Sequence, residues 1–84
     1  MEEEVIGRVE RFFPKIGVAA IKMTHGTLKV GDRIKIKGKV TDFEQAVESM
    51  QVEHENVQKV ETGVDVGIKV IEKVREHDMV YLLK

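Results

Sequence analysis

Hydrophobic and polar residues alternate along most of this chain with a period of two. The clearest run is "RIKIK", residues 33–37, in which isoleucines alternate with cationic residues. "VDVGIKV", residues 64–70, alternates just as strictly, and shorter apolar runs occupy residues 5–13, 18–23 and 79–83. Because successive side chains of a β-strand point to opposite faces, each run predicts a strand with one buried and one exposed side.

Glycines separate these runs and predict where the chain turns. Gly26 and Gly31 are expected to take the positive φ of tight reversals, and the Asp32 carboxylate is expected to cap the backbone amides that follow it. Gly63 ends the segment before the last alternating run. Gly67 lies inside that run, where a glycine suggests a bulge or the close approach of another backbone.

Six or seven short strands, without a convincing long helix, predict an all-β fold. The apolar residues of segment 42–52 change phase near Glu48 and Ser49, which predicts the kind of bulge or corner that a barrel needs to close. Val57 and Val60 are three residues apart, as in one helical turn. We therefore predict that residues 1–84 form a single domain, a small closed β-barrel of six to seven strands.

Composition narrows the protein class. The chain has no cysteine, which fits a reducing compartment and argues against a disulfide-stapled secreted domain. Its acidic start lacks the basic and apolar regions of a signal peptide, and no apolar stretch approaches the ~20 residues of a membrane helix. We expect a soluble, cytoplasmic protein without membrane contact. Its 35% charged residues and single asparagine resemble thermophile composition.

One long segment resembles a known family. "GVAAIKMTHGTLKVGDRIKIKG", residues 17–38, is similar to the second, β-barrel domain of translation GTPases such as elongation factor Tu. The likeness continues through Thr62-Gly63, Asp65 and Val66-Gly67 and covers about residues 17–81. It implies a binding module that contacts RNA, the ribosome or a translation-associated protein. Small accessory barrels at the C-terminus of collagenase-like peptidases involved in RNA hydroxylation look similar.

A basic strand face is the candidate binding surface. Arg33, Lys35 and Lys37 share the outward side of one predicted strand, and Lys39 extends the row. Cations about 6.6–7 Å apart roughly match the phosphate spacing of single-stranded nucleic acid. The alternative is a solubilising face that protects a strand edge. The overall balance of 14 Lys and Arg against 15 Asp and Glu disfavours indiscriminate nucleic-acid binding.

The sequence contains no recognisable catalytic motif. A phosphate loop needs G-x-x-x-x-G-K-[ST], but Arg33 stands where the first glycine before Gly38-Lys39 belongs, and Val40 where the hydroxyl belongs. Three histidines lie too far apart for metal-ligand spacing: His25, His54 and His77. We predict no enzymatic activity, nucleotide, metal or cofactor. Two functions stay open: the binding module above, or an accessory subunit that contacts a larger enzyme or GTPase.

Overall fold

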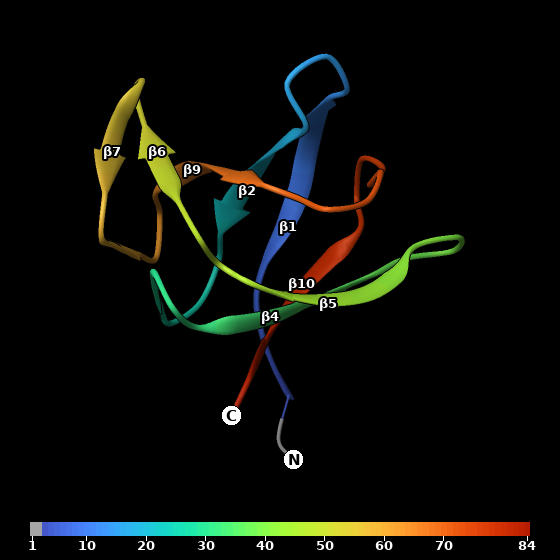
Figure 1. Ribbon diagram of the computed structural model, residues 1–84. Coiled ribbons are helices and arrows are strands. Elements are labelled where there is room, and N and C mark those ends of the chain that lie inside the picture. The colour runs from blue at the N-terminus through green and yellow to red at the C-terminus, as the bar shows by residue number, and fades with distance from the viewer. Residues whose placement is uncertain (1–2) are drawn as a thin grey trace.

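The computed structural model describes residues 3–84, which form ten β-strands in two antiparallel sheets (Figure 1). The strands are β1 (Glu3–Phe13), β2 (Val18–Met23), β3 (Thr27–Lys29), β4 (Arg33–Lys37), β5 (Asp42–Ala46), β6 (Met50–Val52), β7 (Glu55–Val57), β8 (Lys59–Glu61), β9 (Asp65–Lys69) and β10 (Met79–Leu83). The all-β prediction is confirmed. Nothing in residues 3–84 is a helix that could cross a membrane.

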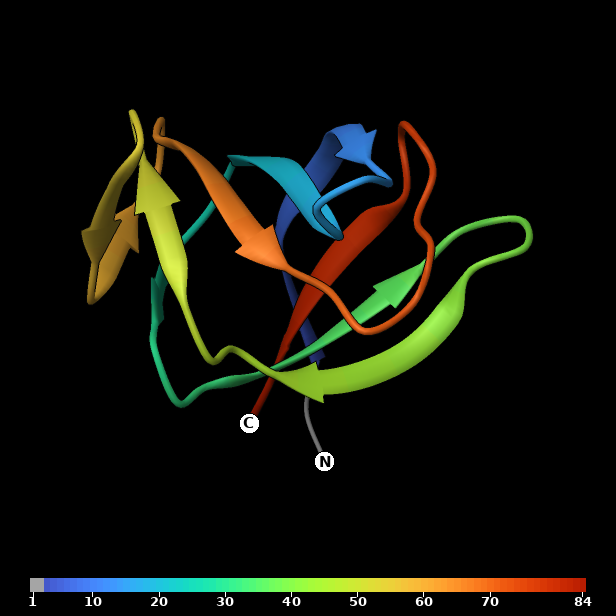
Figure 2. The same cartoon turned by 45° about the horizontal axis from the view of Figure 1, so that its top comes forward.

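Eight strands make one long, curled sheet in the order β5-β4-β10-β1-β2-β9-β6-β7, and β3 pairs with β8 in a second sheet. Figure 2 shows the long sheet wrapping around a common interior. Residues from both sheets fill that interior, and Ile6, Leu28, Ile34 and Ile68 have no exposed surface. Each such side chain contributes about 1.5–3 kcal/mol when buried, so the interior is the main source of stability.

The first strand shows where simple alternation fails. Strict period two puts Ile6 and Val9 on opposite faces of β1, yet both are fully buried. The register of β1 shifts between Val5 and Gly7 against β10, and between Val9 and Arg11 against β2. Each bulge adds one residue and reverses the phase of the side chains beyond it. β4 and β9 contain no such shift, and their predicted alternation is confirmed.

The predicted closure of the barrel is wrong, because the long sheet ends in two edge strands, β5 and β7, that do not pair with each other. A seam remains between β5 and the end of β9, where Gln45 meets Lys69 and Ile71. The side chain of Gln45, on β5, spans this seam instead of a backbone ladder. Its Nε2 donates to the carbonyl oxygens of Lys69 at 2.8 Å and Ala46 at 3.3 Å. Its Oε1 accepts from the Ile71 amide at 2.9 Å. A side-chain amide has the same donor and acceptor as a peptide group, so it replaces one missing strand pairing.

The turns differ from the predictions in detail. Gly26 and Gly31 have φ of 71° and 101°, the left-handed conformation expected of them. Asp32 Oδ2 accepts a hydrogen bond from the Lys29 amide at 2.9 Å, so its carboxylate caps an amide that precedes it rather than one that follows. The helical turn suggested around residues 57–60 is wrong, since Val57 ends the short strand β7 and Val60 lies in the short strand β8.

Candidate functional site

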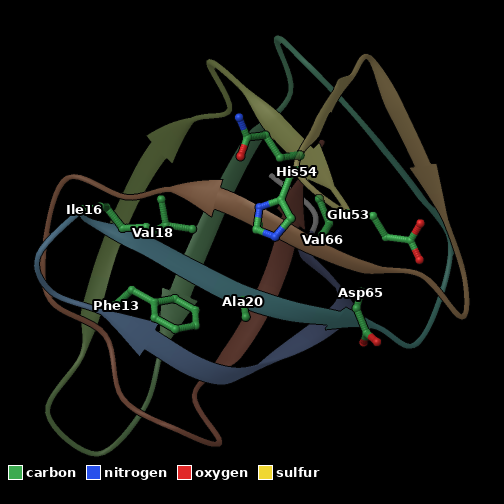
Figure 3. A pocket seen from close by; sticks show the side chains of 10 residues that line it. Phe13, Ile16, Val18, Ala20, Glu53, His54, Asp65 and Val66 are labelled. Carbon is green, nitrogen blue, oxygen red and sulfur yellow. The ribbon is translucent and has the colours of Figure 1, made fainter.

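A shallow groove of about 340 Å³ lies on the outer face of the sheet, over β1, β2, β9 and β6 (Figure 3). Its floor is low because the outward positions there carry small residues. Ala20 of β2 is paired with Gly67 of β9, which is paired in turn with Gln51 of β6. Outward positions of a solvated sheet usually carry polar side chains. Small residues at the centre of this face therefore create the hollow.

Gly67 is closely packed as well as small. A Cβ atom at this position would lie 3.3 Å from Cγ1 of Val18, and Gly67 keeps an ordinary strand conformation. No register shift occurs between β2 and β9 at this residue. Neither predicted alternative describes this glycine: the tight neighbour is a side chain, and the backbone oxygen of Gln51 would be at an ordinary 3.7 Å from such a Cβ atom.

The turn between β1 and β2 forms an apolar wall at one end of the groove. Phe13 is 39% exposed and Ile16 is 62% exposed, and both line the hollow beside Val18. The turn is held by the Gly17 amide, which donates to the Phe13 carbonyl at 2.9 Å. The Arg11 guanidinium lies 5.9 Å from the centre of the Phe13 ring, a cation–π contact with this wall.

The turn between β6 and β7 forms the opposite wall. Glu53 and His54 have φ of 51° and 68°, an uncommon conformation for residues with a side chain. Two-residue hairpins favour Asn-Gly at such positions, so the Glu-His turn carries strain. In Figure 3 the His54 ring lies over the groove, above β2 and β9. The strained turn thus positions a polar ring over an apolar floor.

Carboxylates line the end of the groove farthest from Phe13. Asp65 and Glu53 lie at this end in Figure 3. Lys22 Nζ is 3.6 Å from Asp65 Oδ1, with the two side chains 38% and 67% exposed. An ion pair this exposed contributes little stability and exchanges easily with another cation. Within residues 3–84, Glu53 makes no ion pair.

The predicted basic surface lies elsewhere, on the outer face of β4. Arg33, Lys35 and Lys37 point outward as expected, and Lys39 is exposed in the loop that follows. None of the four lines the groove. Lys35 Nζ lies 3.2 Å from Glu3 Oε2, and the hydrogen bond and charge of Glu3 raise the pKa of Lys35.

Neighbouring carboxylates and a second cleft change the interpretation of this basic row. On β5, Glu44 is opposite Lys35 and Asp42 is opposite Lys37, so acidic residues accompany the cations. Lys37 and Lys39 also line a cleft of about 410 Å³ together with Arg75 and His77. The sequence did not predict this cleft, because the two pairs of residues are far apart along the chain. Whether this surface contacts RNA, the ribosome or a protein stays a prediction.

The buried Asp78 carboxylate and the glycine packed on it shape the second cleft. Asp78 is buried at its base, and Oδ2 of its carboxylate accepts from the Arg75 amide at 2.9 Å. A side chain at Gly38 would collide with this carboxylate, so the β4–β5 loop packs directly on it.

The structure places the three histidines apart: His54 at the groove, His77 at the second cleft and His25 beside Thr24. Residues 3–84 hold no group of three side chains able to bind a metal ion.

Comparison with known protein sequences shows which proteins this chain is similar to. No protein-family model matches the chain. The chain is 49% identical over 80 residues to an uncharacterized protease of Methanocaldococcus jannaschii, covering 94% of this chain and 19% of the relative. It is 35% identical over 81 residues to a collagenase of Porphyromonas gingivalis, covering 95% and 22%. The chain therefore spans about a fifth of the length of these curated relatives.

Solved structures agree with the sequence relatives. The C-terminal domain of a U32 peptidase from Geobacillus thermoleovorans superposes with a TM-score of 0.88 at 20% identity, covering 96% of this chain and 93% of that one. A selenomethionine variant of that domain gives 0.86 at 21% identity. The fold is that of a U32 peptidase C-terminal domain.

These findings overturn the resemblance to translation GTPases and the function drawn from it. The matched relatives are named as a protease and collagenases, not as translation factors. The prediction of no enzymatic activity is corrected for the same reason, because the chain is similar to about a fifth of proteins named as a protease and collagenases. A Gly-Asp turn before an alternating strand fits many curled sheets. Gly31-Asp32 therefore indicates the local geometry of the fold and does not identify the family.

Proposed function

We propose that this chain serves as the C-terminal domain of a U32-type peptidase and that its outer groove holds an extended segment of polypeptide. The groove itself carries this proposal. It combines an apolar wall, a floor of small residues and a polar far end on one rigid sheet. The likeness to a protease and to collagenases supports polypeptide as the ligand class.

The dimensions of the groove suit a short extended segment. Val18 and Lys22 are the first and last outward residues of the β2 stretch along the floor, and Lys69 and Asp65 pair with them on β9. Four residues of strand span about 13 Å, so four to five extended ligand residues would fill the length. In a longer peptidase such a domain would present a substrate chain to the rest of the enzyme.

The affinity of so open a groove is expected to be modest. Burying one large apolar side chain contributes about 1.5–3 kcal/mol, and ordering a flexible ligand opposes part of this gain. We expect a dissociation constant of roughly 0.1–1 mM for a single segment. Weak binding to one segment is adequate when the ligand is a long polypeptide, because its other segments stay close to the groove after one of them dissociates.

The experiment titrates the purified chain with a permanently unfolded protein, reduced and carboxymethylated α-lactalbumin, and follows backbone amide NMR signals. We expect shifts to concentrate on Ala20, Gly67 and the two turns that form the walls. Ala20→Glu places a charge on the apolar floor and should weaken binding at least about tenfold. Ala46→Glu is the matched control, because Ala46 is outward on β5, beside Arg33 and away from the groove.

Two outcomes would contradict the proposal. Shifts confined to other surfaces would show that polypeptide binds, but not in the groove. An absence of any shift at millimolar ligand would exclude polypeptide as the ligand. Circular dichroism of both variants shows whether a loss of binding reflects a loss of fold.

A further inference from the structure

The two ends of the groove differ in chemistry, and the difference points to the kind of segment that it takes. We propose, resting on the function above, that the groove prefers extended segments in which a large apolar side chain and a lysine or arginine are four residues apart. The apolar side chain would lie against the β1–β2 turn, and the cation would lie between Glu53 and Asp65.

The apolar end is built from residues that the register brings together. Phe13 of β1 is paired with Val18 of β2, so their outward side chains are neighbours. Ile16 adds an exposed aliphatic side chain from the turn between them. Arg11 and Lys69 flank this end, since Arg11 stacks on Phe13 and Lys69 is paired with Val18. A ligand cation is therefore disfavoured here, and an apolar side chain is favoured.

The far end offers carboxylates. Neither lysine nor arginine lines the groove, whereas Glu53 and Asp65 both do. Gln51 is opposite Gly67, and continuing β6 along the same register brings Glu53 toward the level of Asp65. Lys22 is paired with Asp65 and Arg8 with Lys22, so Asp65 has cations at its own level, whereas Glu53 makes no ion pair within residues 3–84. A ligand cation at this end gains from Glu53, and for Asp65 it competes with an exposed ion pair to Lys22.

The spacing follows from strand geometry. The Val18 and Asp65 levels are four residues apart along β2, about 13 Å. In an extended ligand, residues i and i+4 point to the same side and are separated by the same distance. The groove alone does not fix the chain direction, so either order of the two side chains satisfies the spacing.

The experiment compares three seven-residue peptides of glycine and serine that carry one phenylalanine at the second position. The first has lysine at the sixth position, the second has glutamate there, and the third has lysine at the third position. Amide NMR titration at low salt should show the first peptide binding about tenfold more tightly than the second, and more tightly than the third. Raising the salt should narrow these differences, because exposed charges are screened.

Matched variants assign the preference to the groove carboxylates. Glu53→Gln with Asp65→Asn should reduce the lysine preference to about twofold or less while the peptides still bind. Asp42→Asn with Glu44→Gln makes the same change in charge on β5, outside the groove, and should leave the preference intact. A preference that the β5 variant removes, or that the groove variant leaves unchanged, would overturn the inference.

The outcomes separate this inference from the proposed function. Equal binding of all three peptides in the groove would sink the charge and spacing preference while polypeptide binding stands. Binding of none would end both. Sedimentation showing a dimer that Ala20→Glu dissociates would identify a second copy of the chain as the occupant and would also overturn the inference.

Discussion

Two outward faces of the same curled sheet differ sharply in what they show to solvent. Over β4 and β5, outward cations of one strand face outward carboxylates of the other, with Lys35 opposite Glu44 and Lys37 opposite Asp42. Over β2 and β9, the corresponding positions hold Ala20 and Gly67 at the centre of a hollow. Mixed charges keep a sheet soluble and discourage pairing with other strands, whereas small apolar residues leave room for a ligand.

The comparison shows that a row of cations in the sequence does not reveal which charges surround it in the fold, and whether the basic row binds a partner stays a prediction. The cations of the basic row are close together in the sequence, but the fold supplies acidic neighbours that sequence order does not reveal. The hollow is inconspicuous in the sequence because its residues are small. A missing side chain on an outward strand position is informative only when its neighbours across the sheet are known.

The largest expected effect on stability comes from removing the Gln45 side chain, which links β5 to the end of β9. Gln45→Leu removes three hydrogen bonds and leaves the Ile71 amide and the Lys69 carbonyl without their partner. We expect a loss of about 2–4 kcal/mol in the free energy of unfolding, measured by urea denaturation. Gln51→Leu is the control, since its side chain bonds only the exposed Asn56 at 3.1 Å and should cost less than about 0.5 kcal/mol. Equal losses in both variants would show that the seam has no special role.

An intermediate effect concerns the strained wall of the groove. Glu53→Asn with His54→Gly gives the β6–β7 turn the residues that positive φ favours. We expect a gain of about 1 kcal/mol in the free energy of unfolding, because the left-handed conformation no longer costs energy. The same variant should weaken peptide binding, since it removes the Glu53 carboxylate and the His54 ring. A variant that is no more stable than the parent in thermal unfolding would refute the strain.

The smallest effect tests the charged face. The pKa of Lys35 is raised by its hydrogen bond to Glu3 and by the Glu3 charge. A raised pKa in the folded state stabilises the fold below the ordinary lysine pKa, and the contribution is lost as pH rises through the raised value. Between pH 10 and 12, the parent should therefore lose slightly more stability than Lys35→Met, as measured by denaturation at each pH. Parallel pH profiles would show that the pair contributes nothing.

The strands were the most predictable part of the fold. Ile34 and Ile36 alternate with cations in one uninterrupted register, and period two was enough to place them in the interior. In β1, the two bulges reversed the phase, so Ile6 and Val9 defeated the same rule. Bulges depend on the neighbouring strands, which one strand's own pattern does not encode.

The groove and the open seam left weaker traces in the sequence. Gln45 shared the phase of Phe43 and Val47, and an amide on an otherwise apolar face was the available sign of a buried polar contact. Ala20 is a small residue in the sequence, but its pairing with Gly67 follows only from the topology. The Glu53-His54 turn carried no usual turn signal, because neither residue type favours positive φ. The strain of the turn has the same cause.

A rolled sheet held along one margin by a single amide has a preferred place to come undone. Thermal fluctuation would lift β5 away from residues 69–71 before it disturbs the fully paired strands on the other side. Proton exchange, proteolytic clipping and the tolerance of added residues would then all concentrate along the same margin. Because Lys69 stays paired with Val18 on the other side, the floor of the groove would keep its shape while β5 loosens.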